Sequence, residues 1–124
     1  MLKLMVIDDH AGDRVAVERI VKSLSNVKWI GAYVKPQEAL NEAAKSKPHV
    51  VIAAVELADM NGIAFTSKLQ DILPSVCVIV SAQSGHYARE AYEAGARGYL
   101  IKPIGKESLM KMLDHARTKY WNWR

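Results

Sequence analysis

The feature that most constrains the fold of this chain is a regular alternation of short apolar runs with longer stretches of helical spacing. Each apolar run has the length of a β-strand and is rich in β-branched residues. The runs cover residues 2–7, 27–33, 50–55, 76–80 and 98–101. Because aromatic residues make up only 7% of the chain, aliphatic side chains must fill most of any core built from these runs.

The stretches between the runs place apolar residues on one face of a helix. In the first of them, Val17, Ile20, Val21 and Leu24 follow the spacing i, i+3, i+4 and i+7. The later stretches carry Ala39, Leu40, Ala43 and Ala44; Phe65, Leu69 and Ile72; Ala88, Ala91 and Tyr92; and Leu109, Met112, Leu113 and Ala116. The pattern therefore predicts five helices, one after each strand.

Prolines and a glycine predict where several of these helices begin and end. Pro36 suits the start of the second helix, because its ring fixes a helical φ where no backbone donor is needed. Pro74 closes the third helix, and Gly95 is well placed as a left-handed cap after the fourth.

Five β-α units in succession predict an α/β fold, a doubly wound, five-stranded parallel sheet with helices on both faces. The 124 residues fit one domain, which we place at residues 1–120, with residues 121–124 as a C-terminal tail or the start of a linker. In such sheets ligands bind at the carboxyl ends of the strands. The polar residues at those ends are therefore the candidates for function.

Composition narrows the class of protein. The 17 basic and 13 acidic residues give a net charge of +4, but the basic residues are scattered and indicate a solvated surface. The basic, aromatic stretch 116–124 leaves nucleic-acid binding open as an alternative. The lone Cys77 excludes an intrachain disulfide and suits a reducing, cytoplasmic setting. The sequence has neither a signal peptide nor an apolar run long enough to cross a membrane.

Four side chains stand at the predicted strand ends. Asp8 and Asp9 follow the first strand, Ser81 the fourth, and Lys102 the fifth, where Pro103 comes next. Two adjacent carboxylates repel each other unless a cation is near, and Mg²⁺ would satisfy them. Taken alone, however, the pair is better explained by Asp9 capping the next helix while Asp8 is solvated.

The combination of these residues resembles the receiver domain of two-component response regulators. The matching stretches are VIDDH at 6–10, MNG at 60–62, VIVSA at 78–82 and EAGARGYLIKPI at 93–104. The resemblance covers essentially the whole chain, in order and in spacing. It implies a flavodoxin-like (βα)5 fold and a role in phosphorelay signal transduction.

The resemblance also implies roles for individual residues. Ser81 takes the hydroxyl position that tracks the phosphoryl group, and Lys102 the position that pairs with the phosphorylated aspartate. Tyr99 takes the rotating aromatic position that reports activation, although an ordinary half-buried strand tyrosine explains it equally well.

The chain departs from the family at the phosphoacceptor. Counting back eight residues from Gly62 gives Ala54, where the family has its aspartate. A methyl group cannot form the aspartyl phosphate. By the resemblance, Asp8, Asp9 and the backbone carbonyl of Glu56 remain as Mg²⁺ ligands, so Mg²⁺ binding is expected to be weak.

The loss of the acceptor has two explanations. The chain is either a natural pseudo-receiver or an engineered Asp→Ala form of an ordinary receiver. The retained Ser81 and Lys102 favour an engineered or recent loss. Two further departures, Ala58 for the usual proline and His49 for a frequent aspartate, favour natural drift, to which we give slightly more weight. Glu56 and Asp59 lie nearby but do not project from position 54, so neither is expected to replace the acceptor.

The expected function is that of a regulatory interaction module rather than an enzyme. The resemblance implies a sensor histidine kinase or other signalling proteins as partners, and DNA only through an output domain that controls transcription. A homodimer would use the fourth helix, the fifth strand and the fifth helix, a region that includes Tyr87, Tyr92, Tyr99, Lys106 and Lys111.

A cofactor-binding domain of the same fold class is the alternative from another class. Asp8, His10 and Gly12 are similar to the cobalamin-binding motif D-x-H-x-x-G, but the glycine comes one residue early. The chain also has no glycine-rich loop at a helix start to hold a nucleotide phosphate. A flavin, nucleotide or cobalamin site is therefore disfavoured.

Overall fold

The computed structural model describes residues 1–118, which form a five-stranded parallel sheet with helices on both faces. This confirms the predicted α/β fold and its order of elements. The elements are β1 Leu2–Ile7, α1 Ala11–Lys22, β2 Val27–Tyr33, α2 Pro36–Ser46, β3 Val50–Ala54, α3 Gly62–Ile72, β4 Cys77–Ala82, α4 Ala88–Glu93, β5 Gly98–Ile101 and α5 Lys106–Ala116, with a 3₁₀ turn η1 at Gly85–Tyr87.

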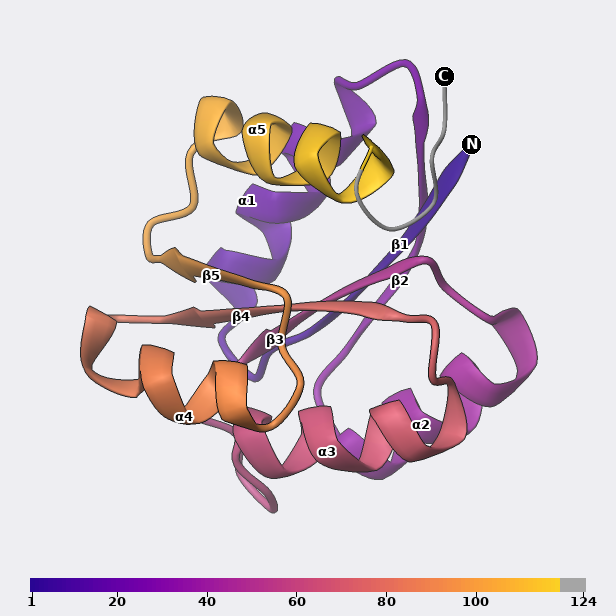
Figure 1. Ribbon diagram of the computed structural model, residues 1–124. Coiled ribbons are helices and arrows are strands. Elements are labelled where there is room, and N and C mark those ends of the chain that lie inside the picture. Colours follow the sequence, from indigo (N-terminus) through magenta and orange to yellow (C-terminus); the bar gives the residue numbers. More distant parts are fainter. Residues whose placement is uncertain (119–124) are drawn as a thin grey trace.

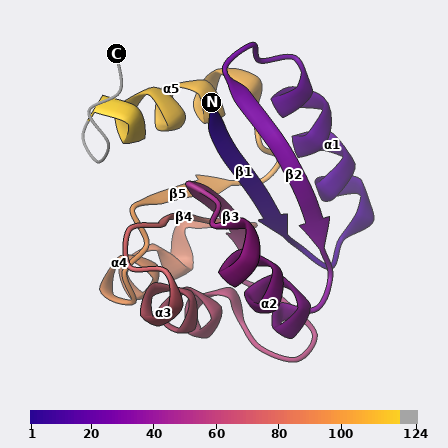
Figure 2. The same ribbon diagram turned by 90° about the vertical axis from the view of Figure 1, so that its right-hand side faces the viewer.

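The strand order is β2-β1-β3-β4-β5, so the chain first adds β2 outside β1 and then crosses to the other side. Helices α1 and α5 cover one face of the sheet, and α2, α3 and α4 cover the other (Figure 1). The quarter-turned view shows α1 running beside β1 and β2 (Figure 2). The strand order reverses between β1 and β3. The carboxyl ends of these two strands lie next to each other, as expected for a ligand-binding edge.

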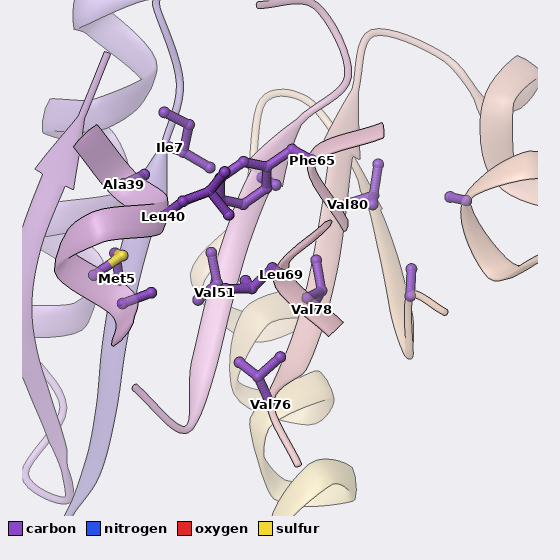
Figure 3. Close-up of a cluster of buried hydrophobic side chains, with 14 of the residues drawn as sticks. Met5, Ile7, Ala39, Leu40, Val51, Phe65, Leu69, Val76, Val78 and Val80 are labelled. Atoms are coloured by element: carbon purple, nitrogen blue, oxygen red, sulfur yellow. The ribbon is translucent and has the colours of Figure 1, made fainter. Parts of the chain in front are cut away.

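The central strands are apolar without alternation because both of their faces are buried. On one face, Phe65 and Leu69 of α3 pack with Leu40 of α2 against Val51 and Val78 of the sheet (Figure 3). Burying a side chain of the size of Phe65 contributes about 2–3 kcal/mol. A second core lies on the other face, where its members from the two helices are Val17, Val21, Leu109, Leu113 and Ala116.

Most element boundaries agree with the sequence, and the differences have local causes. Pro36 is the first residue of α2, and Gly95 has a φ of +110° directly after the cap of α4, as predicted. Leu24 lies beyond the end of α1, although it still packs against the core. Strand β4 runs on to Ala82, since its last two residues pair with β5.

The expected tail or linker at residues 121–124 lies outside the described residues, as does most of the basic, aromatic stretch considered for nucleic-acid binding. Within residues 1–118, no helix combines the length and apolarity that a bilayer crossing requires.

His49 joins the starts of two neighbouring strands and carries a prediction about pH. Its Nδ1 accepts a hydrogen bond from the backbone N–H of Lys3 at 2.9 Å, and its own N–H donates to the Lys3 carbonyl. Burial, followed by the positive charge of Lys3, lowers the pKa of His49 below its ordinary value. The folded state therefore prefers the neutral ring, and its contribution to stability is complete above the unfolded pKa of about 6.5 and is lost as pH falls below it.

We expect the His49→Asn variant to lose less stability than the parent chain between pH 7 and pH 5. The amide oxygen of asparagine can accept the same hydrogen bond and does not titrate in this range. Denaturant unfolding at several pH values measures the difference in free energy of unfolding. A difference between the two proteins that stays constant with pH would contradict the assignment.

Candidate functional site

The carboxyl end of β1 buries one carboxylate of the acidic pair. Asp8 is only 4% exposed, so the expectation of a solvated Asp8 is wrong. Its backbone N–H donates to the Tyr33 carbonyl at 3.0 Å, which continues the pairing with β2. One of its carboxylate oxygens, Oδ1, accepts from the His10 N–H at 2.9 Å, and its carbonyl accepts from the Arg14 guanidinium at 2.8 Å. These bonds fix Asp8 at the edge of the sheet.

The cap of α1 is His10 and not Asp9. The ring Nδ1 of His10 accepts from the backbone N–H of Asp13 at 3.3 Å, which satisfies one of the free donors of the first turn. Asp9 is exposed and lies at the cavity formed by the strand ends. Because the turn from β1 buries Asp8 and exposes Asp9, the chain reaches α1 one residue later than capping by Asp9 would require.

Lys102 places its ammonium at this edge, and two carboxylates hold it. Its Nζ lies 2.9 Å from Asp8 Oδ2 and 2.7 Å from Asp13 Oδ2. The side chain of Lys102 is 11% exposed, so burial alone would lower its pKa. The hydrogen bonds to Asp13 and Asp8 outweigh this effect and raise the pKa of Lys102 above its ordinary value. The ammonium is therefore charged throughout the physiological range.

Asp13 is a residue of this site that the sequence reading missed. Its carboxylate contacts both Lys102 and the His10 ring, where Oδ2 lies 3.1 Å from Nδ1. The available signal was its place three residues after His10, which puts Asp13 in the first turn of the helix that follows the acidic pair. An acidic residue in a first turn is usually explained by its favourable interaction with the helix dipole. For this reason the sequence alone does not indicate that Asp13 also belongs to the site at the strand ends.

Ala54 and Ser81 face each other across β3 and β4. They are register partners in the sheet, and both are almost fully buried. The Ser81 Oγ has no hydrogen-bond partner within the described part of the chain. Since a buried hydroxyl is normally paired, this group is a polar atom at the strand ends whose bonding needs are unmet.

The loop after β3 returns to Ala54 through a close backbone approach. The N–H of Gly62 donates to the Val55 carbonyl at 2.8 Å. A Cβ built on Gly62 would lie 2.0 Å from the Ala54 carbonyl oxygen. Glycine in the MNG stretch is thus required by space, and it fixes where β3 ends.

These elements enclose a cavity of about 130 Å³ at the carboxyl edge of the sheet. It is lined by Asp9, His10, Asp13, Glu56, Ser81, Ala82, Gln83 and Lys102. The structure therefore brings together Asp9, Glu56, Ser81 and Lys102 of the predicted site. Asp8 is connected to the same edge through Lys102.

The carboxylates here do not fit a preformed Mg²⁺ site. No three His, Cys, Asp or Glu side chains of residues 1–118 are grouped so that they could hold a metal ion. One oxygen of Asp8 is engaged by the Lys102 ammonium and the other by the His10 N–H. A cation at Asp8 would have to compete with Lys102 for the same carboxylate.

Tyr99 lies half-buried on β5, next to the cavity edge of the sheet. Its hydroxyl donates to the Ser84 carbonyl at 2.6 Å, in the turn that leads into α4. Burial is the main reason why the pKa of Tyr99 is raised above its ordinary value, and Tyr87 has smaller effects on this pKa in both directions. The ring therefore connects β5 to the turn after β4, whichever of the two sequence explanations applies.

The surface expected to mediate dimerisation is only partly open. Tyr92 is 51% exposed, and Ile101 of β5 is 54% exposed. Tyr87 and Tyr99 instead pack against the core. Lys111 pairs with Glu107 at 3.3 Å along the exposed face of α5. With Met110 of α5, the region thus offers three large exposed side chains of which one is a tyrosine, rather than a row of tyrosines.

Comparison with known proteins assigns the fold and the family. The family model described as the response regulator receiver domain matches residues 4–114. The sensory transduction protein LytT of Bacillus anthracis is 28% identical over 113 residues, which cover 91% of this chain and 46% of that protein. The response regulator GacA of Pseudomonas protegens is 26% identical over 115 residues, which cover 91% of this chain and 54% of that protein.

The solved structures agree. The response regulator domain of Thermotoga maritima CheB superposes with a TM-score of 0.80 at 25% identity, covering 92% of this chain and 95% of that one. The chain spans about half the length of the two curated relatives, so the match concerns one domain of each. With the family model matching from β1 into α5, this chain belongs to the response regulator receiver domain family of two-component signalling.

Proposed function

We propose that this chain is a receiver that works without phosphate, because Ala54 occupies the position of the phosphoacceptor aspartate. The observation that carries the proposal is the buried methyl group of Ala54 beside the unpaired hydroxyl of Ser81. In receivers of the family, the hydroxyl tracks a phosphoryl group on that aspartate. Here the hydroxyl lies beside a side chain that has no nucleophile, at the same edge of the sheet as Lys102 and the acidic residues.

The nearby acids do not supply a substitute nucleophile in the same place. Glu56 and Asp59 are both exposed, whereas Ala54 is buried at the end of β3. Asp13 reaches the cavity, but its carboxylate is engaged by Lys102. None of these residues occupies position 54, the register partner of Ser81 at the end of β3.

The Mg²⁺ affinity of this chain is expected to be weak. The proposed ligands are Asp8, Asp9 and the backbone carbonyl of Glu56. The carboxylate of Asp8 already binds Lys102, and position 54 supplies no third carboxylate. The affinity of a site for a hard divalent cation depends on the number and charge of its oxygen ligands, so the loss of each carboxylate weakens Mg²⁺ binding.

Without phosphate, the balance between receiver conformations would be set by other proteins. We propose a sensor histidine kinase or another signalling protein as partner, and a homodimer through α4, β5 and α5, where Tyr92 and Ile101 are exposed. Control of transcription would pass through an output domain, so DNA is an indirect partner. The length of the curated relatives beyond the shared region supports this arrangement. The domain itself is proposed to have no enzymatic activity.

The first test is phosphorylation by a small-molecule donor. We expect this chain, incubated with Mg²⁺ and acetyl phosphate, to show no phosphate adduct by intact mass, and the Ala54→Asp variant to gain one. The variant restores a carboxylate beside Ser81 and Lys102, while Ala54→Asn restores only the shape and is the matched control. An adduct on the parent chain would mean that another carboxylate accepts phosphate, and the proposal would fail.

A second test concerns stability in the absence of divalent cations. We expect Ala54→Asp to lower the free energy of unfolding by about 2 kcal/mol in chelator, because it buries a carboxylate near Asp8 and Asp13. Added Mg²⁺ should restore part of this loss. Denaturant unfolding with chelator and with Mg²⁺ provides the measurement, and Ala54→Asn separates charge from size. A higher melting temperature for the aspartate variant in chelator would refute the expectation.

A further inference from the structure

Lys102 has a partner in this chain that does not belong to the family pattern. By the resemblance, the lysine at the end of β5 pairs with the acceptor at the end of β3. Here the end of β3 is the methyl group of Ala54, and the shorter of the two contacts of Lys102, at 2.7 Å, is made to Asp13 in α1. The ammonium thus makes its shorter contact with a residue of α1.

The position of Asp13 is well defined by its surroundings. Its backbone N–H is bound by the His10 ring, and its side chain is only 22% exposed. That exposure is low for a carboxylate in the first turn of a surface helix, where water would otherwise solvate it. The carboxylate is held in this place by the ammonium 89 residues further along the chain.

The geometry points to Asp13 as a positioning residue that replaces the missing acceptor carboxylate as counter-ion of Lys102, and so fastens the loop after β5 to the start of α1. This inference rests on the proposed function, in which Ala54 stands at the acceptor position. Two carboxylates and one ammonium form a closed group with hydrogen-bonding distances at both contacts. The ammonium of Lys102 is therefore paired with Asp8 and Asp13, and not with position 54, in the absence of phosphate.

The consequence for regulation is that the group takes the place of a phosphate-dependent contact. In a phosphorylated receiver, Lys102 would turn to a new anion at position 54. In this chain Asp13 supplies the anion permanently, from a different element. The link between the β1–α1 and β5–α5 loops is then a fixed property of the fold, and partners meet one arrangement of these loops.

The direct test is the ammonium signal of Lys102 in ¹H–¹⁵N spectra. An ammonium held by two carboxylates exchanges its protons slowly, and we expect a resolved Lys102 signal in the parent chain at neutral pH. The signal should disappear in Asp13→Ala and persist in Asp13→Glu, which keeps the charge. Glu18→Ala on the same helix removes an acid that pairs with Lys22, and it should leave the signal unchanged. A Lys102 signal that survives in Asp13→Ala, or is absent from the parent chain, would overturn the inference.

A kinetic test separates this inference from the proposed function. In the Ala54→Asp background, adding Asp13→Ala removes the shorter of the two carboxylate contacts of Lys102 and leaves only Asp8. We expect phosphate uptake from acetyl phosphate to become at least about fivefold faster, roughly 1 kcal/mol by the tenfold-per-1.36 conversion. Adding Glu18→Ala should not change the rate. Equal rates with and without Asp13 would contradict the inference. If no Ala54→Asp protein takes up phosphate, the proposed acceptor position fails, and the spectra alone decide the role of Asp13.

Discussion

The Gly62→Ala variant is expected to lose about 3 kcal/mol of its free energy of unfolding, because a Cβ at Gly62 makes the closest approach found at any described glycine. The new Cβ would lie 2.0 Å from the carbonyl oxygen and 2.7 Å from the carbonyl carbon of Ala54. Both atoms belong to the backbone of a buried strand, so neither can rotate away as a side chain would. Relief requires moving the end of β3 or the start of α3, and both are bonded in place.

The matched control for this prediction is Gly105→Ala. A Cβ on Gly105 meets nothing within 4 Å, and its φ of −92° suits any residue. We expect a change within about 0.5 kcal/mol for this variant. Equilibrium unfolding in urea measures both, and similar values for the two variants would show that the approach of Gly62 to β3 is not tight.

The second large effect is expected from Lys102→Met. Removing the ammonium leaves Asp8, which is 5% exposed in its side chain, and Asp13 without their cation. An unpaired buried carboxylate is costly, and we expect a loss of about 3 kcal/mol at neutral pH. The raised pKa of Lys102 has a related consequence, because its contribution is present below the unfolded pKa of about 10.5 and is lost as pH rises through the higher folded value.

Lys111→Met provides the control for Lys102→Met. Lys111 also pairs with a carboxylate, Glu107, but both side chains are more than three-quarters exposed. A surface pair of this kind contributes little, so the variant should unfold nearly as the parent does. The double variant Asp8→Asn with Lys102→Met should recover part of the loss, because it removes the unpaired charge. A loss in Lys102→Met no greater than in Lys111→Met would contradict the burial of the pair.

The fold was predictable because its signals are repeated along the chain. Strands buried on both faces read as unbroken apolar runs, and amphipathic helices show their own period, so the order of elements followed from pattern alone. Boundaries were less certain where pairing decides them. Strand β4 extends through Ser81 and Ala82 because β5 lies beside them, and no local propensity indicates this.

The site was predictable only where its residues directly follow strands. Asp8, Asp9, Ser81 and Lys102 were found in this way, and the structure places them at one edge. The roles within the acidic pair were not found, since burial of Asp8 and capping by His10 depend on how the turn after β1 is closed. Asp13 was missed because its partner lies 89 residues away, a distance that helical spacing cannot reveal.

The strand order also bears on how the domain is assembled as the chain leaves the ribosome. Strand β1 lies between β2 and β3, so these three neighbouring strands need only the first half of the chain. Asp8 is buried at the end of β1, yet the ammonium that neutralises it comes after β5. Until Lys102 has been synthesised, the carboxyl edge carries a charge that resists burial. The half of the sheet that contains the amino ends of the strands is therefore expected to consolidate first, and the edge that holds the site last.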